Sequence, residues 1–90
     1  MKLERGKGDY PAPPVGRVIR GMLDMRGHLY EMMLVGPEQI DIERAKSPEP
    51  LLGEPVMFAL SPVYECFMFF PAPDADLKAM IWYYPPVAEI

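Results

Sequence analysis

Apolar residues concentrate in two segments near the end of the chain, 56–70 and 77–84. Twelve of the fifteen residues in the first segment are apolar, as are seven of the eight in the second. Burying one large apolar side chain stabilises a fold by about 1.5–3 kcal/mol, and aromatic side chains contribute most. We therefore expect these two segments to form the core, with Phe67 and Ile81 buried at its centre.

The first segment predicts two strands, near 55–60 and 63–70. It is rich in Val, Phe and Tyr, which favour strands. Ser61 and Pro62 interrupt it, and a proline would remove a donor from a central strand. A cluster of proline and aspartate at 71–74 then indicates a loop.

The second segment fits two structures. Its apolar positions 77, 80, 81 and 84 have helical spacing, and Asp74 is placed as an N-cap, which would give a helix near 75–84. The run at 80–84 is nevertheless β-prone, and two prolines end it at strand length. We favour the strand, which would pair with 63–70 as an antiparallel hairpin over a six-residue loop.

The clearest hairpin signal lies at residues 17–35. Two β-prone runs flank the sequence DMRG, in which aspartate first and glycine last match a type I turn. In the expected register Arg20 lies opposite Glu31, and such an opposite-charge pair stabilises a register by about 0.2–1 kcal/mol. The pattern also allows a register that is shifted by one residue.

The segment that follows this hairpin is short and ambiguous. Residues 38–46 can form a helix with Pro37 at its first position. Ile40 and Ile42 also alternate with acidic residues, as in a short edge strand. The proline-rich connector at 47–55 is not expected to hold regular structure.

Composition separates residues 1–14 from the rest of the chain. They include two glycines, three prolines and four apolar residues, so they bury too little to order themselves. We expect a flexible or extended N-terminal arm over 1–14, frayed or docked outside the core, and a single small domain over 15–90. Loss of residues 1–8 should then leave the melting temperature nearly unchanged.

These elements together predict a mainly β fold, a small single-domain curled sheet or barrel of five to six short strands. The alternative is an α+β antiparallel sheet with one helix near 75–84. Ninety residues are enough for one core of modest stability.

Charge and composition limit the classes of partner that the chain is expected to bind. The net charge of −4 divides into +3 over residues 1–30 and −7 over residues 31–90, and this acidic excess argues against general nucleic-acid binding. No apolar run approaches the roughly 20 residues of a membrane span, and the first residues lack the apolar core of a secretory signal. With one cysteine, the chain is expected to be a soluble cytoplasmic protein that does not bind membranes.

The sequence offers few candidates for catalysis. Cys66 is the lone cysteine and His28 the lone histidine, so a nucleophile–base pair or a zinc site has too few residues. Cys66 in an apolar run is typical of a small buried hydrophobe. Glu65, in the same run, is expected on a strand face with Val63 and Phe67, with access to water at an edge. We therefore expect that the protein is not an enzyme and that it has neither a cofactor nor a metal site.

The favoured function is protein binding, as an adaptor or inhibitor. Eight methionines, five tyrosines and one tryptophan exceed what one small core hides, and these residue types are enriched in interfaces. A small acidic domain also suits an inhibitor of phage or mobile-element type. This hypothesis follows from the size of the protein and not from any particular residue. The alternative is a small-ligand protein, for a nucleotide-like molecule, that uses hairpin arginines and aromatics. The candidate binding residues are Arg17, Arg20, Arg26, Tyr30, Trp82, Tyr83 and Tyr84.

Trp82 has two interpretations. It fills the core, or it belongs to a surface that binds a protein partner or a second copy of the chain as a homo-oligomer. A strand at 77–84 would place Trp82 and Tyr84 on one face and Ile81 and Tyr83 on the other.

Overall fold

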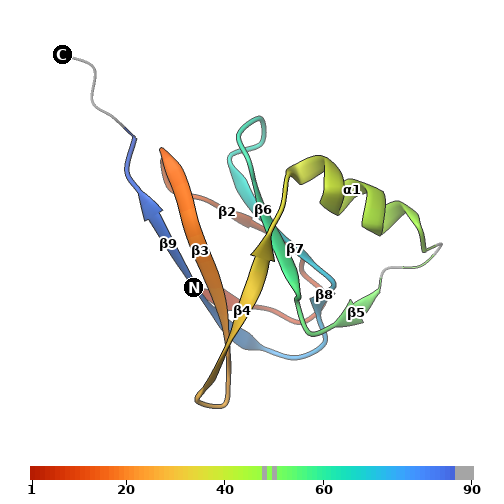
Figure 1. Ribbon diagram of the computed structural model, residues 1–90. Helices are drawn as coiled ribbons and strands as arrows, with labels where there is room; N and C mark the ends of the chain where they lie inside the picture. Colours follow the sequence, from red (N-terminus) through yellow and green to blue (C-terminus); the bar gives the residue numbers. More distant parts are fainter. Residues whose placement is uncertain (48, 50, 87–90) are drawn as a thin grey trace.

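The chain folds into a strongly curled sheet with one helix packed on its outside (Figure 1). The structure is a computed structural model, which describes residues 1–47, 49 and 51–86. The seven strands of the sheet lie in the order β1-β9-β3-β4-β6-β7-β2, and β5 pairs separately with β8. The expected mainly β class is confirmed. The strands are β1 Lys2–Leu3, β2 Asp9–Pro11, β3 Arg17–Met25, β4 His28–Leu34, β5 Leu52–Gly53, β6 Met57–Ser61, β7 Cys66–Phe70, β8 Ala72–Pro73 and β9 Leu77–Tyr84, and the helix is α1 Pro37–Ala45.

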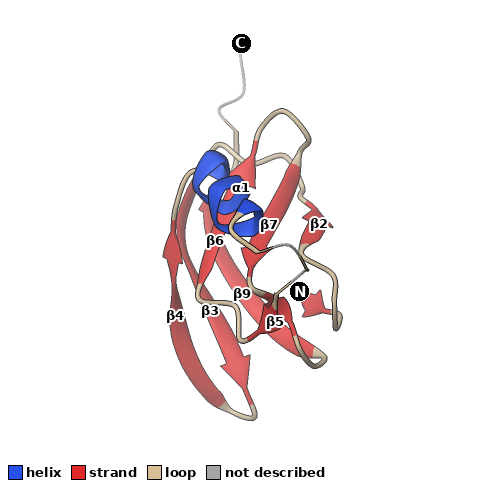
Figure 2. Ribbon diagram, turned by 90° about the vertical axis from the view of Figure 1, so that its right-hand side faces the viewer, coloured by secondary structure: helices blue, strands red, loops and turns tan. Residues whose placement is uncertain are grey.

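The core lies on both faces of strands β6 and β7. One face turns into the curl of the sheet, where Phe58 and Phe69 stack with ring centroids 6.3 Å apart. The other face is covered by α1, through the fully buried Ile40 (Figure 2). Both faces are apolar because both are buried, which explains the dense hydrophobic run in this part of the sequence. Phe67 is a core residue as predicted, whereas Ile81 is partly buried and packs against the core.

The β3–β4 hairpin is present, with a different turn from the one expected. Met25 pairs with His28, so Arg26 and Gly27 form a two-residue turn, and both have positive φ, 54° and 91°. Positive φ at both central residues is the signature of a type I′ turn, whose twist matches that of the strands. Asp24 stabilises the turn by accepting a hydrogen bond from the Gly27 N–H at 2.9 Å. The predicted type I turn is therefore wrong.

Segment 77–84 is the strand β9, but its predicted neighbour is wrong. It pairs antiparallel with β3 along its length and with β1 at its start, and β7 pairs with β6 and β2 instead. The chain cannot turn straight back after β7 because residues 72–73 form β8, which pairs in parallel with β5. The strand after Pro62 also starts later than expected, at Cys66. Glu65 lies in the preceding turn with a φ of 50°, so it does not share a strand face with Phe67.

The helix lies at Pro37–Ala45, which confirms the helical alternative for 38–46 and excludes a helix near 75–84. Gly36 is the N-cap and Pro37 occupies the first turn, where the missing N–H costs nothing. Strand β4 then runs parallel to β6, and α1 provides the crossover between them.

The N-terminal segment contacts both edges of the sheet. Its strand β1 pairs with β9 and its strand β2 pairs with β7. Leu3 and Tyr10 are 1% and 5% exposed and belong to the core, so the expectation that this segment stays outside the core is wrong. The Tyr10 hydroxyl accepts the Glu4 N–H at 2.7 Å and donates to the Lys7 carbonyl at 2.7 Å. Two well-placed side chains thus compensate for a composition poor in apolar residues.

Candidate functional site

The seven candidate residues occupy three places. Arg17, Arg20, Trp82 and Tyr84 lie on the outer side of the β4-β3-β9 part of the sheet, because Arg17 pairs with Tyr84 and Arg20 with Trp82. Tyr30 and Tyr83 lie on the inner side, opposite Leu23 and Val18 respectively, which pack in the core. Arg26 is at the tip of the β3–β4 hairpin. The structure therefore brings four of the seven together.

The outer side of these three strands is rich in apolar residues. Of the seven outward positions on β4 and β9, five are apolar: Leu29 and Met33 on β4, and Met80, Trp82 and Tyr84 on β9. Their exposed fractions include 65% for Met33, 60% for Tyr84, 48% for Leu29 and 42% for Trp82. We call this surface the outer face; it consists of Arg17, Arg20, Met22, Asp24, Leu29, Glu31, Met33, Lys78, Met80, Trp82 and Tyr84.

Helix α1 leaves the outer face uncovered. It packs on β6 and β7 and reaches β2 through the Arg44–Asp9 ion pair, and within the described part of the chain no other element lies over β4, β3 and β9 from outside (Figures 1 and 2). Antiparallel sheets with one solvated face normally alternate apolar residues inward with polar residues outward. The outer face departs from that pattern on both of its flanking strands.

Arg20 occupies the centre of the outer face. Its guanidinium carbon lies 5.7 Å from the centre of the Trp82 ring, within the range of a cation–π contact. It also forms an ion pair with Glu31 at 3.3 Å. The predicted register, with Arg20 directly opposite Glu31, is wrong, because Met22 is the residue opposite Glu31. The ion pair forms between diagonal neighbours instead. A shallow hollow of about 340 Å³ lies beside them, lined by Ile19, Arg20, Glu31, Met32, Met33 and Leu34.

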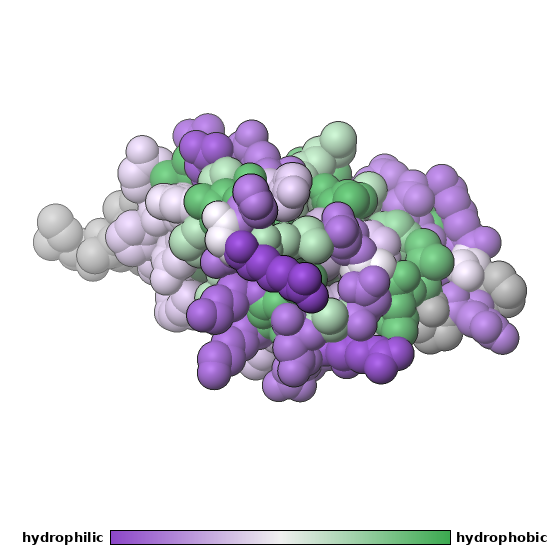
Figure 3. Space-filling view, turned by 90° about the horizontal axis from the view of Figure 1, so that it is seen from below, coloured by the Kyte–Doolittle hydropathy of each residue, from purple (hydrophilic) through white to green (hydrophobic). Residues whose placement is uncertain are grey.

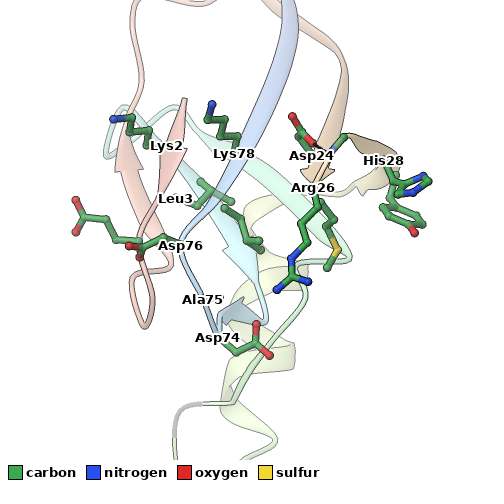
Figure 4. A pocket seen from close by; sticks show the side chains of 14 residues that line it. Lys2, Leu3, Asp24, Arg26, His28, Asp74, Ala75, Asp76 and Lys78 are labelled. Carbon is green, nitrogen blue, oxygen red and sulfur yellow. Dashed lines mark hydrogen bonds between the residues drawn. The ribbon is translucent and has the colours of Figure 1, made fainter.

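A second candidate is an open cleft of about 1110 Å³ at the hairpin end of the molecule. Arg26, from the hairpin tip, and Asp74, from the loop before β9, extend into it from opposite sides (Figure 4). Tyr30 and Leu77 also line it. Seen from this end, hydrophilic side chains frame and interrupt the apolar surface (Figure 3).

The charges of the cleft do not favour an anion. Its lining includes four carboxylates against three permanent cations, which are Glu4, Asp24, Asp74 and Asp76 against Lys2, Arg26 and Lys78. A phosphate group binds best where several cations or backbone N–H groups converge without competing carboxylates. The cleft therefore brings Arg26 and Tyr30 together but lacks the positive excess of a nucleotide site.

Neither Cys66 nor His28 has the surroundings of a catalytic group. Burial raises the pKa of the Cys66 thiol, and the nearby Asp9 carboxylate adds to that rise. A raised thiol pKa keeps the sulfur protonated and a poor nucleophile. His28 lies at the exposed start of β4, whereas Cys66 lies opposite Ser61 at the end of β6, which runs parallel to β4, so the two are at opposite ends of the sheet. Among the residues described, no three His, Cys, Asp or Glu side chains are close enough to hold a metal ion.

The chain matches no protein-family model and no curated protein with which it was compared. Over the described residues, it contains no helix that is both long and apolar enough to cross a membrane. The assignment of a function rests on the geometry of the surface.

Sequence reasoning missed the apolar residues of β4. The exposed fractions of Leu29 and Met33 are as high as those of Trp82 and Tyr84, yet the sequence does not mark them as candidates. Met32, Met33 and Leu34 are consecutive apolar residues, so the sequence does not show which of them point outward. One signal could have found them: β4 has apolar residues at both odd- and even-numbered positions, so some of them must point outward whichever face is buried.

Proposed function

We propose that the chain is a protein-binding domain, an adaptor or inhibitor, that contacts its partner through the outer face. The observation that carries this proposal is the five exposed apolar side chains of the outer face, two on β4 and three on β9, which flank Arg20 and Met22 of β3. Contiguous exposed apolar surface rimmed by polar groups is a mark of interaction sites in proteins. Trp, Tyr and Met are also the residue types most enriched where partners bind.

The polar residues of the outer face fit this function as well. Arg20 is held between Trp82 and Glu31, so its guanidinium is oriented before a partner arrives. Trp, Tyr and Arg dominate the binding energy of measured interfaces, commonly by about 2 kcal/mol or more each on truncation. Arg20 and Trp82 therefore support a central contact with the partner. Glu31 neutralises Arg20, so less net charge loses its water when the partner binds.

The small-ligand alternative is supported only by the size of the cleft. Its mixed charges favour neither a phosphate nor another simple anion, and Trp82 and Arg20 lie elsewhere. The free thiol of Cys66 is consistent with a reducing compartment, so the partner is proposed to be a cytoplasmic protein.

Affinity capture from the native host tests the proposal. Met33→Glu places a charge in the outer face at a side chain that is already largely exposed, so the fold should survive. Val63→Glu places the same charge at an exposed apolar residue in the β6–β7 turn and serves as the matched control. The wild-type chain and the control should capture the same protein and Met33→Glu should lose it; equal capture by all three would contradict the proposal.

A further inference from the structure

Strand β9 has a partly free edge. On one side it pairs with β3 along its length, and on the other it pairs with β1 only at Leu77 and Lys78. Beyond that, the amino group and carbonyl of Met1 bond to Ala79 at 2.7 and 2.9 Å. Residues 80–84 have no strand beside them on this edge in the described part of the chain.

The backbone groups that point out of the free edge can be assigned. Ala79 directs its N–H and C=O toward Met1, away from β3. These directions alternate along a strand, so Ile81 and Tyr83 direct theirs out of the same edge. On the β3 side, the Tyr84 carbonyl accepts the Gly16 N–H at 2.9 Å, as this alternation requires. Two donors and two acceptors therefore lie along the free edge.

The free edge lacks the usual protection against strand addition. Native edge strands are kept apart by charged residues, prolines, bulges or short length. Residues 79–84 contain neither a charge nor a proline, and the bulge near Ile19 lies on β3. By contrast, β2 at the other end of the sheet has three residues, starts at Asp9 and ends at Pro11.

We propose that this edge binds the same edge of a second copy of the chain, antiparallel, with Trp82 opposite Trp82 of the second copy. In that register each Ile81 lies opposite the other copy's Tyr83, and all four outward groups of each copy are bonded. A register shifted toward the start of β9 would need Ala79, whose groups already bond to Met1. A shift toward its end would need Pro85, which has no N–H. The edge is therefore complementary to itself in one register.

The side chains of the outer face support the same register. Met80 of each copy would lie opposite Tyr84 of the other, and the two Trp82 side chains would be direct neighbours. Aromatic cross-strand pairs stabilise antiparallel strands, and Arg20 already packs on the opposite flank of Trp82. The proposal stands apart from the proposed function because it uses the backbone edge of β9, and a dimer would join the two outer faces into one surface.

Cysteine crosslinking tests the register. In a Cys66→Ala background, Trp82→Cys places two thiols at directly opposite, non-hydrogen-bonded positions, where Cα atoms are about 4.5 Å apart, within the range of a disulfide. Tyr84→Cys and Met80→Cys are matched variants on the same outer face, whose like thiols would lie roughly 14 Å apart. Under oxidised glutathione, Trp82→Cys should dimerise alone, and the other two should crosslink only when they are mixed. Equal self-crosslinking of all three, or none for Trp82→Cys and for the mixture, would overturn the proposal.

Sedimentation of the uncrosslinked chain gives a second test. The chain should be dimeric within the micromolar range, and Tyr83→Pro, which removes one outward N–H, should be a folded monomer. Tyr83→Ala retains the N–H and should dimerise more strongly than Tyr83→Pro. A wild-type chain that stays monomeric throughout would overturn the proposal. Met33→Glu lies on β4, away from this edge, so it should lose partner capture and keep the dimer, which separates this inference from the proposed function.

Discussion

A Cβ atom on Gly21 would lie 2.7 Å from the Cζ atom of Phe58. Gly21 is buried on the inner side of β3, and Phe58 is fully buried on β6. Strand β4 lies between these two strands in the sheet. The ring of Phe58 thus reaches across the curl into space that only a glycine leaves free.

Gly21→Ala should lower the free energy of unfolding by about 1–3 kcal/mol, because an added methyl group overpacks a filled core. Phe58→Leu in the same chain should recover part of that loss, since it removes the ring that the methyl group meets. Urea unfolding of the two single variants and the double variant measures the coupling. Additive losses would show that the two residues do not compete for the same space.

Phe67→Ala should lower the free energy of unfolding by about 3–5 kcal/mol, because Phe67 is buried inside the curl of the sheet. Val63→Ala, in the exposed β6–β7 turn, provides a control with little expected change. Denaturant midpoints measured by circular dichroism compare the two. An unchanged midpoint for Phe67→Ala would place the core elsewhere.

Removal of residues 1–8 should lower the melting temperature by more than about 8 °C, the reverse of the expectation from composition. The reason is the loss of the buried Leu3 and of the contacts between Met1 and Ala79. Leu3→Ala alone should cost about 2–5 kcal/mol, whereas Lys2→Ala, at an exposed position, should cost little. A truncated chain with the wild-type melting temperature would show that the segment does not contribute to stability.

Stability should fall as the pH rises above about 10. Burial raises the pKa of Tyr10, and the hydrogen bond from the Glu4 N–H opposes that rise only in part. Between the unfolded and folded pKa values the unfolded chain has lost a proton that the folded chain keeps, so alkali favours unfolding. Tyr10→Phe should be less stable at neutral pH, having lost the hydroxyl contacts, but should lose less stability between about pH 9 and about pH 11. Denaturant midpoints measured across this pH range test the prediction. An equal fall of the midpoint with pH in both chains would show that Tyr10 does not cause the loss of stability.

Local features of the fold could be predicted from the sequence. The β3–β4 hairpin follows from two β-prone runs around a turn, and the placement of Trp82 and Tyr84 on one face follows from alternation along a strand. The neighbours of β9 could not be predicted, because pairing with β3 depends on contacts between distant parts of the chain.

The part of the candidate site that consists of distinctive residue types could be predicted from the sequence. Arg20 and Trp82 stand out as residue types, and the structure places them in contact. Leu29 and Met33 do not stand out, because a buried and an exposed apolar residue look the same in a sequence until the strand has a register. Leu3 and Tyr10 were underestimated for a related reason, since composition does not show that two residues can reach the core.

The outer face is tested most directly by the methionine methyl groups. Met22, Met33 and Met80 lie on the outer face, whereas Met32 is in the core and Met57 and Met68 lie on the side of α1. In a chain labelled at the methionine methyl carbons, titration with the captured protein should shift or broaden the NMR signals of Met22, Met33 and Met80 and leave those of Met57 and Met68 unchanged. Changes confined to Met57 and Met68, or none at Met33, would contradict binding through the outer face.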